Sequence, residues 1–369
     1  MPIEIFLRAS GDATNYSYEG KNYTFYNVNS YKSALRQFKN RGIVVTGIFY
    51  LSTSSFPEMM EPEARAGANT PHRGEQPIIF GHNTKDANRK KVEALYSCIA
   101  ENFTSDGVLV ANWVMGNESD QFICYNYSGE ISYDQYHEAF AEQYRLFNAA
   151  VKSRWSNARC YISLDHNWNV GWHMNTTYQG MALVDAFNSD LSHQGRVHWD
   201  MAMHPYPSPE QDCRIWNRNS RMVTDSGNTM QVTMLNAPAW CAYLQLTYGS
   251  DIHICMTETG FSSVYNGADQ RNEQAAAIAY GYYITEFCSS IDLYGIHRIR
   301  DERGETDGGW YLGVWGKPSQ NVFTNMDTKN WQSATAPFIS LVKNSSGKSI
   351  SSWSEVVSGF NGSRWNNLS

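Results

Sequence analysis

The sequence contains little charge, and its balance is slightly acidic. Charged residues make up 18% of the 369 residues, and the formal net charge is −7. A surface of this kind lacks the strongly basic patches that attract phosphate backbones and anionic lipids, which argues against nucleic acid and membranes as partners. No apolar run reaches the roughly 18 residues that a membrane-spanning helix needs, so no transmembrane segment is predicted.

Cysteine is also scarce and irregularly spaced. The seven cysteines are an odd number, and none of them form the short spacings of a zinc or redox motif. The sequence therefore predicts neither a disulfide framework nor a metal site, and we expect buried thiols and no cofactor. The cysteines are Cys98, Cys124, Cys160, Cys213, Cys241, Cys255 and Cys288.

No signal peptide, linker or internal repeat is visible. The first residues, Met1 to Leu7, predict a strand and lack the charged and apolar regions of a leader. They leave the compartment open, and an extracytoplasmic location is the one that we favour. Low-complexity stretches and repeats of fixed period do not occur, so nothing in the composition divides the chain. No pattern specifies the oligomeric state.

Aromatic residues, in contrast, are abundant. They make up 14% of the chain, with 12 Trp and 23 Tyr. Because the C–H faces of sugars stack on aromatic rings, such an excess is typical of proteins that handle carbohydrate. A large core also contains many aromatic side chains, so the composition alone leaves both interpretations open.

Short apolar strands alternate with helical stretches along the chain. Strands are predicted at residues 3–7, 43–51, 77–82, 108–115, 159–164, 197–203, 252–256 and 291–299. Helices are predicted at residues 31–40, 85–103, 133–152, 178–191, 236–247, 270–289 and 331–341. This order predicts the α/β class, with one (β/α)8 TIM barrel over residues 1–369 and long loops at the C-terminal face of the strands. The competing fold is an open doubly wound sheet, which the lack of a Gly-x-Gly-x-x-Gly motif after the first strand disfavours.

Polar residues stand where six of the predicted strands end. A barrel places its chemistry at this rim, so these residues are the candidate site. They are His82 with Asn83, Asn117 with Glu118, Asp165 with His166, His204 with Tyr206, Thr257 with Glu258, and His297 with Arg298.

Two glutamates in this set fit the cleavage of a glycosidic bond. Retaining enzymes use one carboxyl group as acid/base and a second as nucleophile, about 5–5.5 Å apart. Glu118 follows the fourth predicted strand and Glu258 follows the seventh, and these two strands face each other across a barrel mouth. A single Asn-Glu pair is common in proteins, so the argument depends on the second glutamate and on the histidine and tyrosine between them.

These residues resemble the signature of the retaining glycoside hydrolases of clan A, in which an Asn-Glu pair ends strand four and a Glu ends strand seven. His204 and Tyr206 match the His-x-Tyr that often follows strand six in this clan. The resemblance implies a retaining hydrolase that cleaves an O-glycosidic bond in a poly- or oligosaccharide, with Glu118 as acid/base and Glu258 as nucleophile. It also implies that Asn117 bonds the 2-hydroxyl of the sugar and that Tyr206 hydrogen-bonds the nucleophile.

Segments 18–23, 42–46 and 116–118 look closer still to a bacterial family of uncharacterised clan A-like barrels, and this similarity spans most of the chain. The chain departs from the clan pattern at two strand ends. The second strand ends at Tyr50 where the clan commonly has an arginine, and Arg65 or Arg73 in the next loop is the expected substitute. The eighth strand lacks the usual tryptophan, and Trp310 or Trp315 is expected to replace it.

Further substrate contacts are expected from the loops. Tryptophans that follow strand ends among polar residues favour sugar stacking, and we predict that at least two of them border a cleft. They are Trp168, Trp172, Trp310 and Trp315. His82, Asp165 and His166 are expected to bind substrate or to fix the loops that carry them.

Two other functions remain open at this stage. A metal-dependent barrel hydrolase would use His82, His166, His204 and Asp165, but such enzymes usually need an His-x-His on the first strand, and residues 3–9 contain no histidine. A barrel that binds glycans without cleaving them is the second alternative, and the presence of both glutamates argues against it. No sequence pattern specifies the sugar, the linkage or internal against terminal cleavage.

Overall fold

The computed structural model describes residues 1–51, 86–105, 107–126, 128, 131–170, 177–193, 195–217, 219, 221–346, 350–357 and 359–368. The chain forms two compact units. Unit 1 consists of Met1–Asp165 and Asn169–Ala202, and unit 2 of His166–Trp168 and Met203–Ser369. The strand predicted at 77–82 lies outside the described residues, and so do His82, Arg65, Arg73 and Trp172.

Unit 1 contains a mostly parallel sheet. Its strands are β1 (Pro2–Tyr18), β2 (Lys21–Tyr26), β3 (Val45–Leu51), β4 (Val110–Met115) and β5 (Arg159–Asp165). Parallel pairs join β1 to β3, β3 to β4 and β4 to β5, while β2 pairs with β1 in antiparallel fashion. The buried strands β3 and β5 are nearly continuous apolar runs, as expected when both faces of a parallel sheet are covered.

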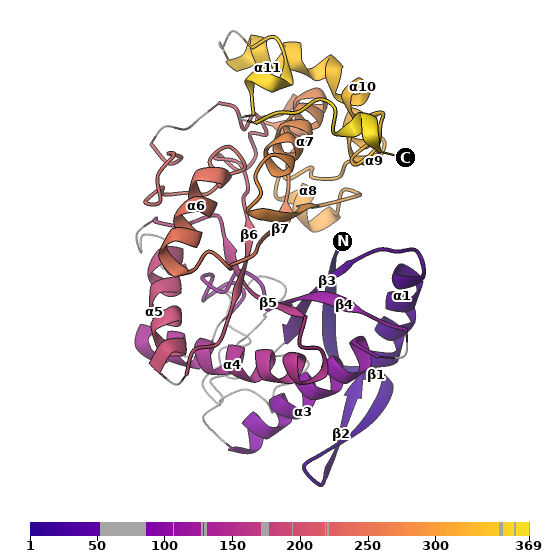
Figure 1. Cartoon of the computed structure of the whole chain (residues 1–369), viewed down its shortest axis with the longest axis vertical. Coiled ribbons are helices and arrows are strands. Elements are labelled where there is room, and N and C mark those ends of the chain that lie inside the picture. The colour runs from indigo at the N-terminus through magenta and orange to yellow at the C-terminus, as the bar shows by residue number, and fades with distance from the viewer. Residues whose placement is uncertain are drawn as a thin grey trace. The chain divides into compact units, whose positions relative to one another are not determined.

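The first strand is longer than the sequence predicts. Its beginning pairs with β3, and its second half forms a hairpin with β2, drawn in indigo in Figure 1. The turn uses Glu19 and Gly20, both in the left-handed region at φ values of 46° and 75°. That backbone conformation suits a two-residue hairpin turn, but a Glu-Gly pair is a weaker sequence signal than Asn-Gly or Asp-Gly.

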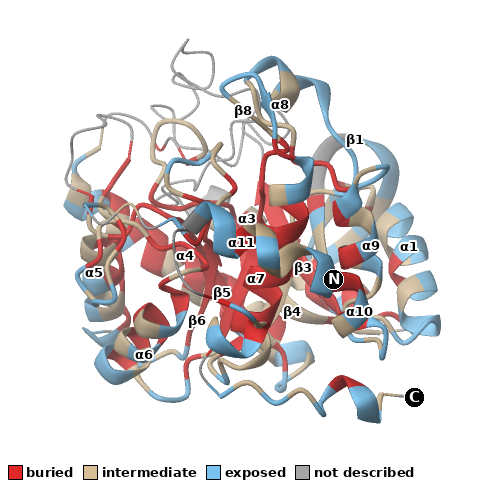
Figure 2. Cartoon of the chain, turned by 90° about the horizontal axis from the view of Figure 1, so that it is seen from above, coloured by how far each residue is buried: buried red, intermediate tan, exposed pale blue. Residues whose placement is uncertain are grey.

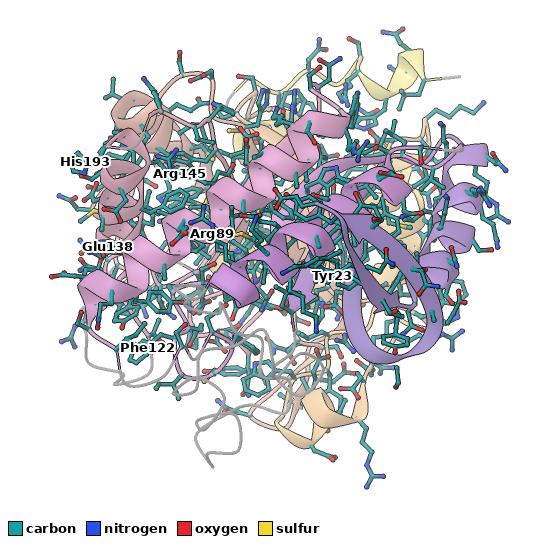
Figure 3. The ribbon with its side chains drawn as sticks, turned by 90° about the horizontal axis from the view of Figure 1, so that it is seen from below. Tyr23, Arg89, Phe122, Glu138, Arg145 and His193 are labelled. Atoms are coloured by element: carbon teal, nitrogen blue, oxygen red, sulfur yellow. The ribbon has the colours of Figure 1, made fainter. Side chains whose placement is uncertain are left out.

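Four helices of unit 1 match the predicted positions closely: α1 (Val28–Asn40), α3 (Asp86–Phe103), α4 (Tyr133–Arg154) and α5 (Gly180–His193). A capping box of Ser132 and Gln135 starts α4. Arg145 of α4 donates hydrogen bonds to the carbonyl oxygens of Leu191 and, at 2.8 Å, Gly195 at the end of α5 (Figure 3). A cation at a helix C-terminus satisfies its last carbonyl groups, so this contact ties α5 to α4.

Unit 2 places parallel strands next to a helix that is buried on all sides. β7 (Ile254–Thr259) and β10 (Ile291–Ile296) pair in parallel, and β8 (Val264–Tyr265) and β9 (Ala268–Asp269) form a small hairpin. β6 (Asp200–His204) enters this unit at its last two residues. Helix α6 (Ala237–Tyr248) precedes β7, and α7 (Arg271–Glu286) is buried from Gln274 to Thr285, as its red ribbon in Figure 2 shows. A helix without a polar face belongs in a core.

The C-terminal part of unit 2 is built from short helices. They are α8 (Arg303–Asp307), α9 (Pro318–Thr324), α10 (Trp331–Thr335), η2 (Ala336–Phe338), α11 (Ile339–Ser346), η3 (Trp353–Glu355) and η4 (Trp365–Asn367). The single helix predicted at 331–341 is interrupted because Pro337 lacks the N–H that a continuous helix needs. Trp331, Trp353 and Trp365 pack around Tyr283 of α7, with ring centroids 4.9–5.3 Å from it.

Parallel strands that alternate with helices are confirmed in both units. A closed eight-stranded barrel is not shown by the residues that the structure describes, and the single domain over 1–369 stays a prediction. Among the described helices, none combines the length and the apolar character that crossing a membrane requires.

Candidate active site

Glu258 stands near the end of β7 and is surrounded by groups that favour its charged form. The Tyr206 hydroxyl donates a hydrogen bond to Oε1. His204 Nδ1 lies 3.7 Å from Oε2, and His297 Nε2 lies 3.9 Å from Oε1. Burial acts to raise the pKa of Glu258, but the two histidines, the Tyr206 hydrogen bond and Arg298 outweigh it, so the pKa is lowered. The side chain is therefore a carboxylate at neutral pH.

Glycine at position 260 makes this arrangement possible. A Cβ atom on Gly260 would lie 2.7 Å from Cε1 of Tyr206 and 2.9 Å from the carbonyl oxygen of His297. Only a residue without a side chain lets the Tyr206 ring and the end of β10 approach β7 this closely. The segment from Thr257 to Gly260 thus both supplies the carboxylate and leaves space for its partners.

A second carboxylate supports His297. Glu305 Oε1 lies 2.8 Å from His297 Nε2 and 3.1 Å from Arg298 Nη2. Burial acts to lower the pKa of His297, and Glu258 and Glu305 reverse this, so the pKa is raised and the imidazolium is favoured. A positive His297 between two carboxylates is consistent with the lowered pKa of Glu258. Sequence reasoning missed Glu305 because it lies in α8, within a stretch predicted as loop.

Asn117 and Glu118 lie in a fixed turn of unit 1. Glu118 has a φ of 43°, in the left-handed region that non-glycine residues rarely adopt. The Asn126 side-chain amide donates to the carbonyl oxygens of Asn117, at 2.9 Å, and Glu118, at 2.7 Å. The backbone N–H of Glu118 donates to Ser163 Oγ of β5 at 3.2 Å. Unfavourable backbone conformations held in this way concentrate at functional sites.

Tyr50 occupies the place where the clan pattern has an arginine. Its hydroxyl donates to Asn117 Oδ1 at 3.4 Å. This contact holds the Asn117 amide from the end of β3. Arg65 and Arg73, which the sequence suggested as substitutes for that arginine, lie outside the described residues.

Asp165 ends β5 beside a buried acid that the sequence did not suggest. Asp120 is fully buried, and its Oδ1 accepts a hydrogen bond from the Asp165 backbone N–H at 3.0 Å. Gln121 Nε2 donates to Asp165 Oδ2 at 2.8 Å. Burial raises the pKa of Asp120 well above its usual value, and the charges of Asp165 and Glu118 raise it further. Asp165 is thus positioned by two residues of the turn that follows Glu118.

Replacing Asp120 by asparagine tests this burial directly. Because the folded-state pKa of Asp120 is raised, the stability that its proton gives is full below the unfolded pKa of about 3.9 and is lost as the pH rises through the folded-state value. Asparagine does not titrate, so Asp120→Asn does not lose stability through this group as the pH rises. Its melting temperature should therefore fall less between pH 4 and 7 than that of the wild type. Thermal unfolding followed by circular dichroism measures both slopes.

The matched variant Asp120→Ala keeps no acceptor for the Asp165 N–H. It is expected to be less stable than Asp120→Asn by about 1–3 kcal/mol, the cost of one unsatisfied buried donor. Equal pH slopes for the wild type and Asp120→Asn would show that Asp120 does not hold its proton as described.

His166 belongs to unit 2 and lies in a small polar cluster. Gln231 Nε2 lies 3.0 Å from His166 Nε2 and 3.0 Å from Asn167 Oδ1, so its two amide protons fit these two acceptors. Glu210 Oε1 is 3.6 Å from the same imidazole nitrogen.

The tryptophans differ in their exposure. Trp168 is 0% exposed, its Nε1 donates to the Gly227 carbonyl at 2.9 Å, and its ring packs edge-on against Trp240. It has no face left for a sugar, so the expectation of stacking on Trp168 is wrong; the apolar side of its loop folds into the core. Trp315 is 49% exposed, and the Arg300 guanidinium lies over its ring at 5.6 Å.

Trp310 borders a pocket of about 290 Å³ in unit 2. The pocket is lined by Pro207, Ser208, Pro209, Glu210, Gln211, Gln231, Tyr265 and Trp310. Its volume is near the lower end of the range for small-molecule sites, about 300–1,000 Å³. Pro207 directly follows Tyr206, so the pocket begins one residue beyond the group that bonds Glu258.

Comparison with known proteins places the chain in a family. Residues 1–356 match the model of a family described as "Family of unknown function (DUF5722)". The chain belongs to this family. No curated protein matches it.

Solved structures with a similar fold include glycoside hydrolases. A glucosidase from Croceicoccus marinus has a TM-score of 0.52 at 14% identity, over 82% of this chain and 54% of that chain. A family 39 glycoside hydrolase from Bacteroides cellulosilyticus WH2 has a TM-score of 0.49 at 15% identity, over 87% of this chain and 56% of that chain. The catalytic domain of an Ignisphaera aggregans GH53 protein has a TM-score of 0.47 at 15% identity, over 85% of this chain and 78% of that chain.

This chain spans about half the length of the first two proteins. The similarity to the glucosidase shows a shared fold. The resemblance to glycoside hydrolases that the sequence suggested is therefore supported at the level of the fold.

Proposed function

We propose that this DUF5722 protein is a retaining glycoside hydrolase that cleaves an O-glycosidic bond in an oligo- or polysaccharide. The observation that carries the proposal is the environment of Glu258. A nucleophilic carboxylate must stay ionised although it is largely removed from solvent, and the Tyr206 hydroxyl, His204 and His297 together favour that state. The fold shared with a glucosidase is consistent with this reaction class, as an analogy at the level of the fold alone.

The proposed reaction has two steps. In the first, a Glu258 oxygen forms a bond to the anomeric carbon while Glu118 gives its proton to the departing glycosidic oxygen, which leaves as an alcohol. In the second, Glu118 takes a proton from water, whose oxygen bonds to the anomeric carbon as the ester bond to Glu258 breaks. Two inversions give a product with the original anomeric configuration. Asn117 is proposed to bond the 2-hydroxyl group, and Asp165 to bind the substrate.

An activity screen tests the proposal. The wild type is assayed on aryl glycosides and on a broad panel of oligo- and polysaccharides, with Glu258→Gln as the inactive control. We expect turnover of at least one substrate, unchanged by a metal chelator and absent in Glu258→Gln. Turnover that a chelator abolishes would support a metal-dependent hydrolase, and binding without turnover on every substrate would support a glycan-binding protein.

Tyr206→Phe is expected to shift the pH profile of the active enzyme. The lost hydrogen bond normally stabilises the charged form of Glu258, so its removal raises the pKa of that carboxyl group and moves the acid limb of kcat/KM to higher pH. At the optimum, kcat/KM should fall by about 10- to 100-fold, as for the loss of a hydrogen bond to a charged group. An acid limb that stays in place would show that Tyr206 does not keep Glu258 ionised.

A further inference from the structure

The pocket that Trp310 borders has a polar and aromatic lining. Two aromatic side chains, Tyr265 and Trp310, stand among amide, hydroxyl and carboxylate groups from Ser208, Glu210 and Gln211. Aromatic rings with a few convergent polar groups are the composition that binds sugar rings, whose faces are apolar and whose edges carry hydroxyl groups.

The pocket is connected to Glu258 by two short routes within unit 2. Tyr206 bonds Glu258 and is followed by Pro207, which lines the pocket. On the other side, His297 lies near Glu258 and contacts Glu305, whose carbonyl oxygen accepts the Trp310 backbone N–H at 2.9 Å. These contacts join two walls of the pocket to the groups that surround Glu258.

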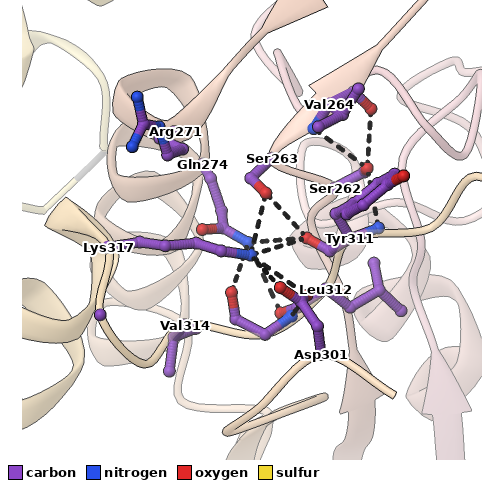
Figure 4. A network of polar contacts seen from close by, with 12 residues as sticks. Ser262, Ser263, Val264, Arg271, Gln274, Asp301, Tyr311, Leu312, Val314 and Lys317 are labelled. Carbon is purple, nitrogen blue, oxygen red and sulfur yellow. Dashed lines mark hydrogen bonds and ion pairs between the residues drawn. The ribbon is translucent and has the colours of Figure 1, made fainter. Parts of the chain in front are cut away.

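A polar network joins the two segments of the chain that carry these aromatic side chains. Tyr265 belongs to β8 and Trp310 precedes Tyr311, and these two segments are joined by the hydrogen bonds in Figure 4. The Ser263 backbone N–H donates to the Tyr311 carbonyl at 3.0 Å, and the Tyr311 N–H donates to Ser262 Oγ at 3.2 Å.

Lys317 completes the network with a bond to Ser263 Oγ at 2.9 Å and an ion pair with Asp301 at 2.8 Å. A site whose backbone is held in place before binding loses less entropy when the ligand arrives.

The Trp310 ring also depends on a glycine. A Cβ atom on Gly308 would lie 2.7 Å from Cζ3 of Trp310, so the ring rests against bare backbone. Gly308 has a φ of −85°, which any residue can adopt. An alanine at this position would thus displace the ring without straining the chain.

The described lining of the pocket carries a negative charge. Of the described residues that border the pocket, Glu210 is the only charged one. Its carboxylate accepts hydrogen bonds from hydroxyl groups and repels uronic acids and sulfated sugars. Gln231, which also lines the pocket, contacts His166 and Asn167, and His166 lies 3.6 Å from Glu210, so the polar cluster described above adjoins the pocket wall.

We propose that this pocket is a subsite for one uncharged sugar ring, next to the ring at Glu258, so that the protein acts on neutral oligosaccharides of at least two rings. The placement beside the scissile bond rests on the function proposed above; the binding of a neutral sugar in the pocket does not.

Binding tests the subsite independently of turnover. Glu258→Gln is titrated by calorimetry with glucose-, mannose-, galactose- and xylose-based oligosaccharides of increasing length, and with oligogalacturonate as the acidic probe. We expect binding of at least one neutral oligosaccharide. Adding Trp310→Ala should raise its Kd at least about tenfold, as for truncation of an aromatic anchor in a binding site. Gly308→Ala should act in the same direction.

Ile299→Ala serves as the matched control, because it removes an exposed apolar side chain from the same segment and does not line the pocket. Its Kd should equal that of the parent. Unchanged affinity in both Trp310→Ala and Gly308→Ala, or tighter binding of the acidic probe, would overturn the subsite.

Turnover separates this inference from the proposed function. If the wild type cleaves oligosaccharides, Trp310→Ala should lower kcat/KM on them about tenfold and leave aryl monoglycosides unaffected. If binding depends on Trp310 but no substrate is turned over, the subsite is supported and the proposed hydrolase activity is contradicted. If Trp310→Ala turns over oligosaccharides as fast as the wild type, the hydrolase activity is supported and the subsite is contradicted.

Discussion

Replacing Glu258 by alanine is expected to abolish turnover on every glycoside, including those with activated aryl leaving groups. A nucleophile must attack the anomeric carbon whatever the leaving group, so a better leaving group cannot compensate for its loss. The expected fall in kcat is roughly 10⁵- to 10⁶-fold, the range for removal of a covalent nucleophile. Initial rates on one natural and one activated substrate measure it.

The control for this variant is Glu355→Ala, which removes an exposed carboxylate of unit 2 that bonds only nearby serines in the described chain. It should keep full activity. Residual turnover of the activated substrate by Glu258→Ala above a thousandth of the wild-type rate would mean that another group forms the bond to the sugar.

Glu118→Ala is expected to show the opposite dependence on the leaving group. A general acid matters when the departing oxygen is a poor leaving group, so natural glycosides should lose about 10²- to 10⁴-fold in kcat/KM while activated aryl glycosides keep much of their first step. Azide should then restore turnover, because a small anion can enter the space left by the carboxylate and needs no base. The product should be a glycosyl azide of retained configuration.

The matched control is Glu138→Ala, an exposed glutamate of α4 labelled in Figure 3, which azide should not affect. Nuclear magnetic resonance identifies the anomeric configuration of the first product. Inverted product from the wild type, with no covalent intermediate, would replace the two-step mechanism by a single displacement. The carboxyl groups would then need a separation of about 6.5–9.5 Å to admit a water molecule.

The periodicity of the sequence predicted the local elements well. Helices α3 and α4 and strands β4 and β5 begin and end within a few residues of the predicted bounds, because their apolar periodicity is a local signal. The β1–β2 hairpin was missed because its Glu-Gly turn is a weak signal and β2 is short, with Phe25 as its one buried residue.

The residues of the candidate site were predictable only where they stand at the ends of predicted strands. Tyr206 was expected to bond Glu258, and the structure contains that contact within unit 2. Asp120, Gln231 and Glu305 were not found, because their partners are 45, 65 and 8 residues away and no local pattern encodes such pairs. Trp168 was misassigned because a loop residue beyond a strand end can turn either to solvent or to the core.

The most direct test of the account is to trap the covalent intermediate. The wild type is incubated with activated 2-deoxy-2-fluoro glycosides of the sugar found in the screen, whose fluorine slows the second step, and is then digested and mapped by mass spectrometry. The account predicts one adduct with the mass of the fluorosugar, on the peptide that contains Glu258, and none in Glu258→Gln. An adduct on any other residue, or an active enzyme that forms no adduct and releases inverted product, would contradict it.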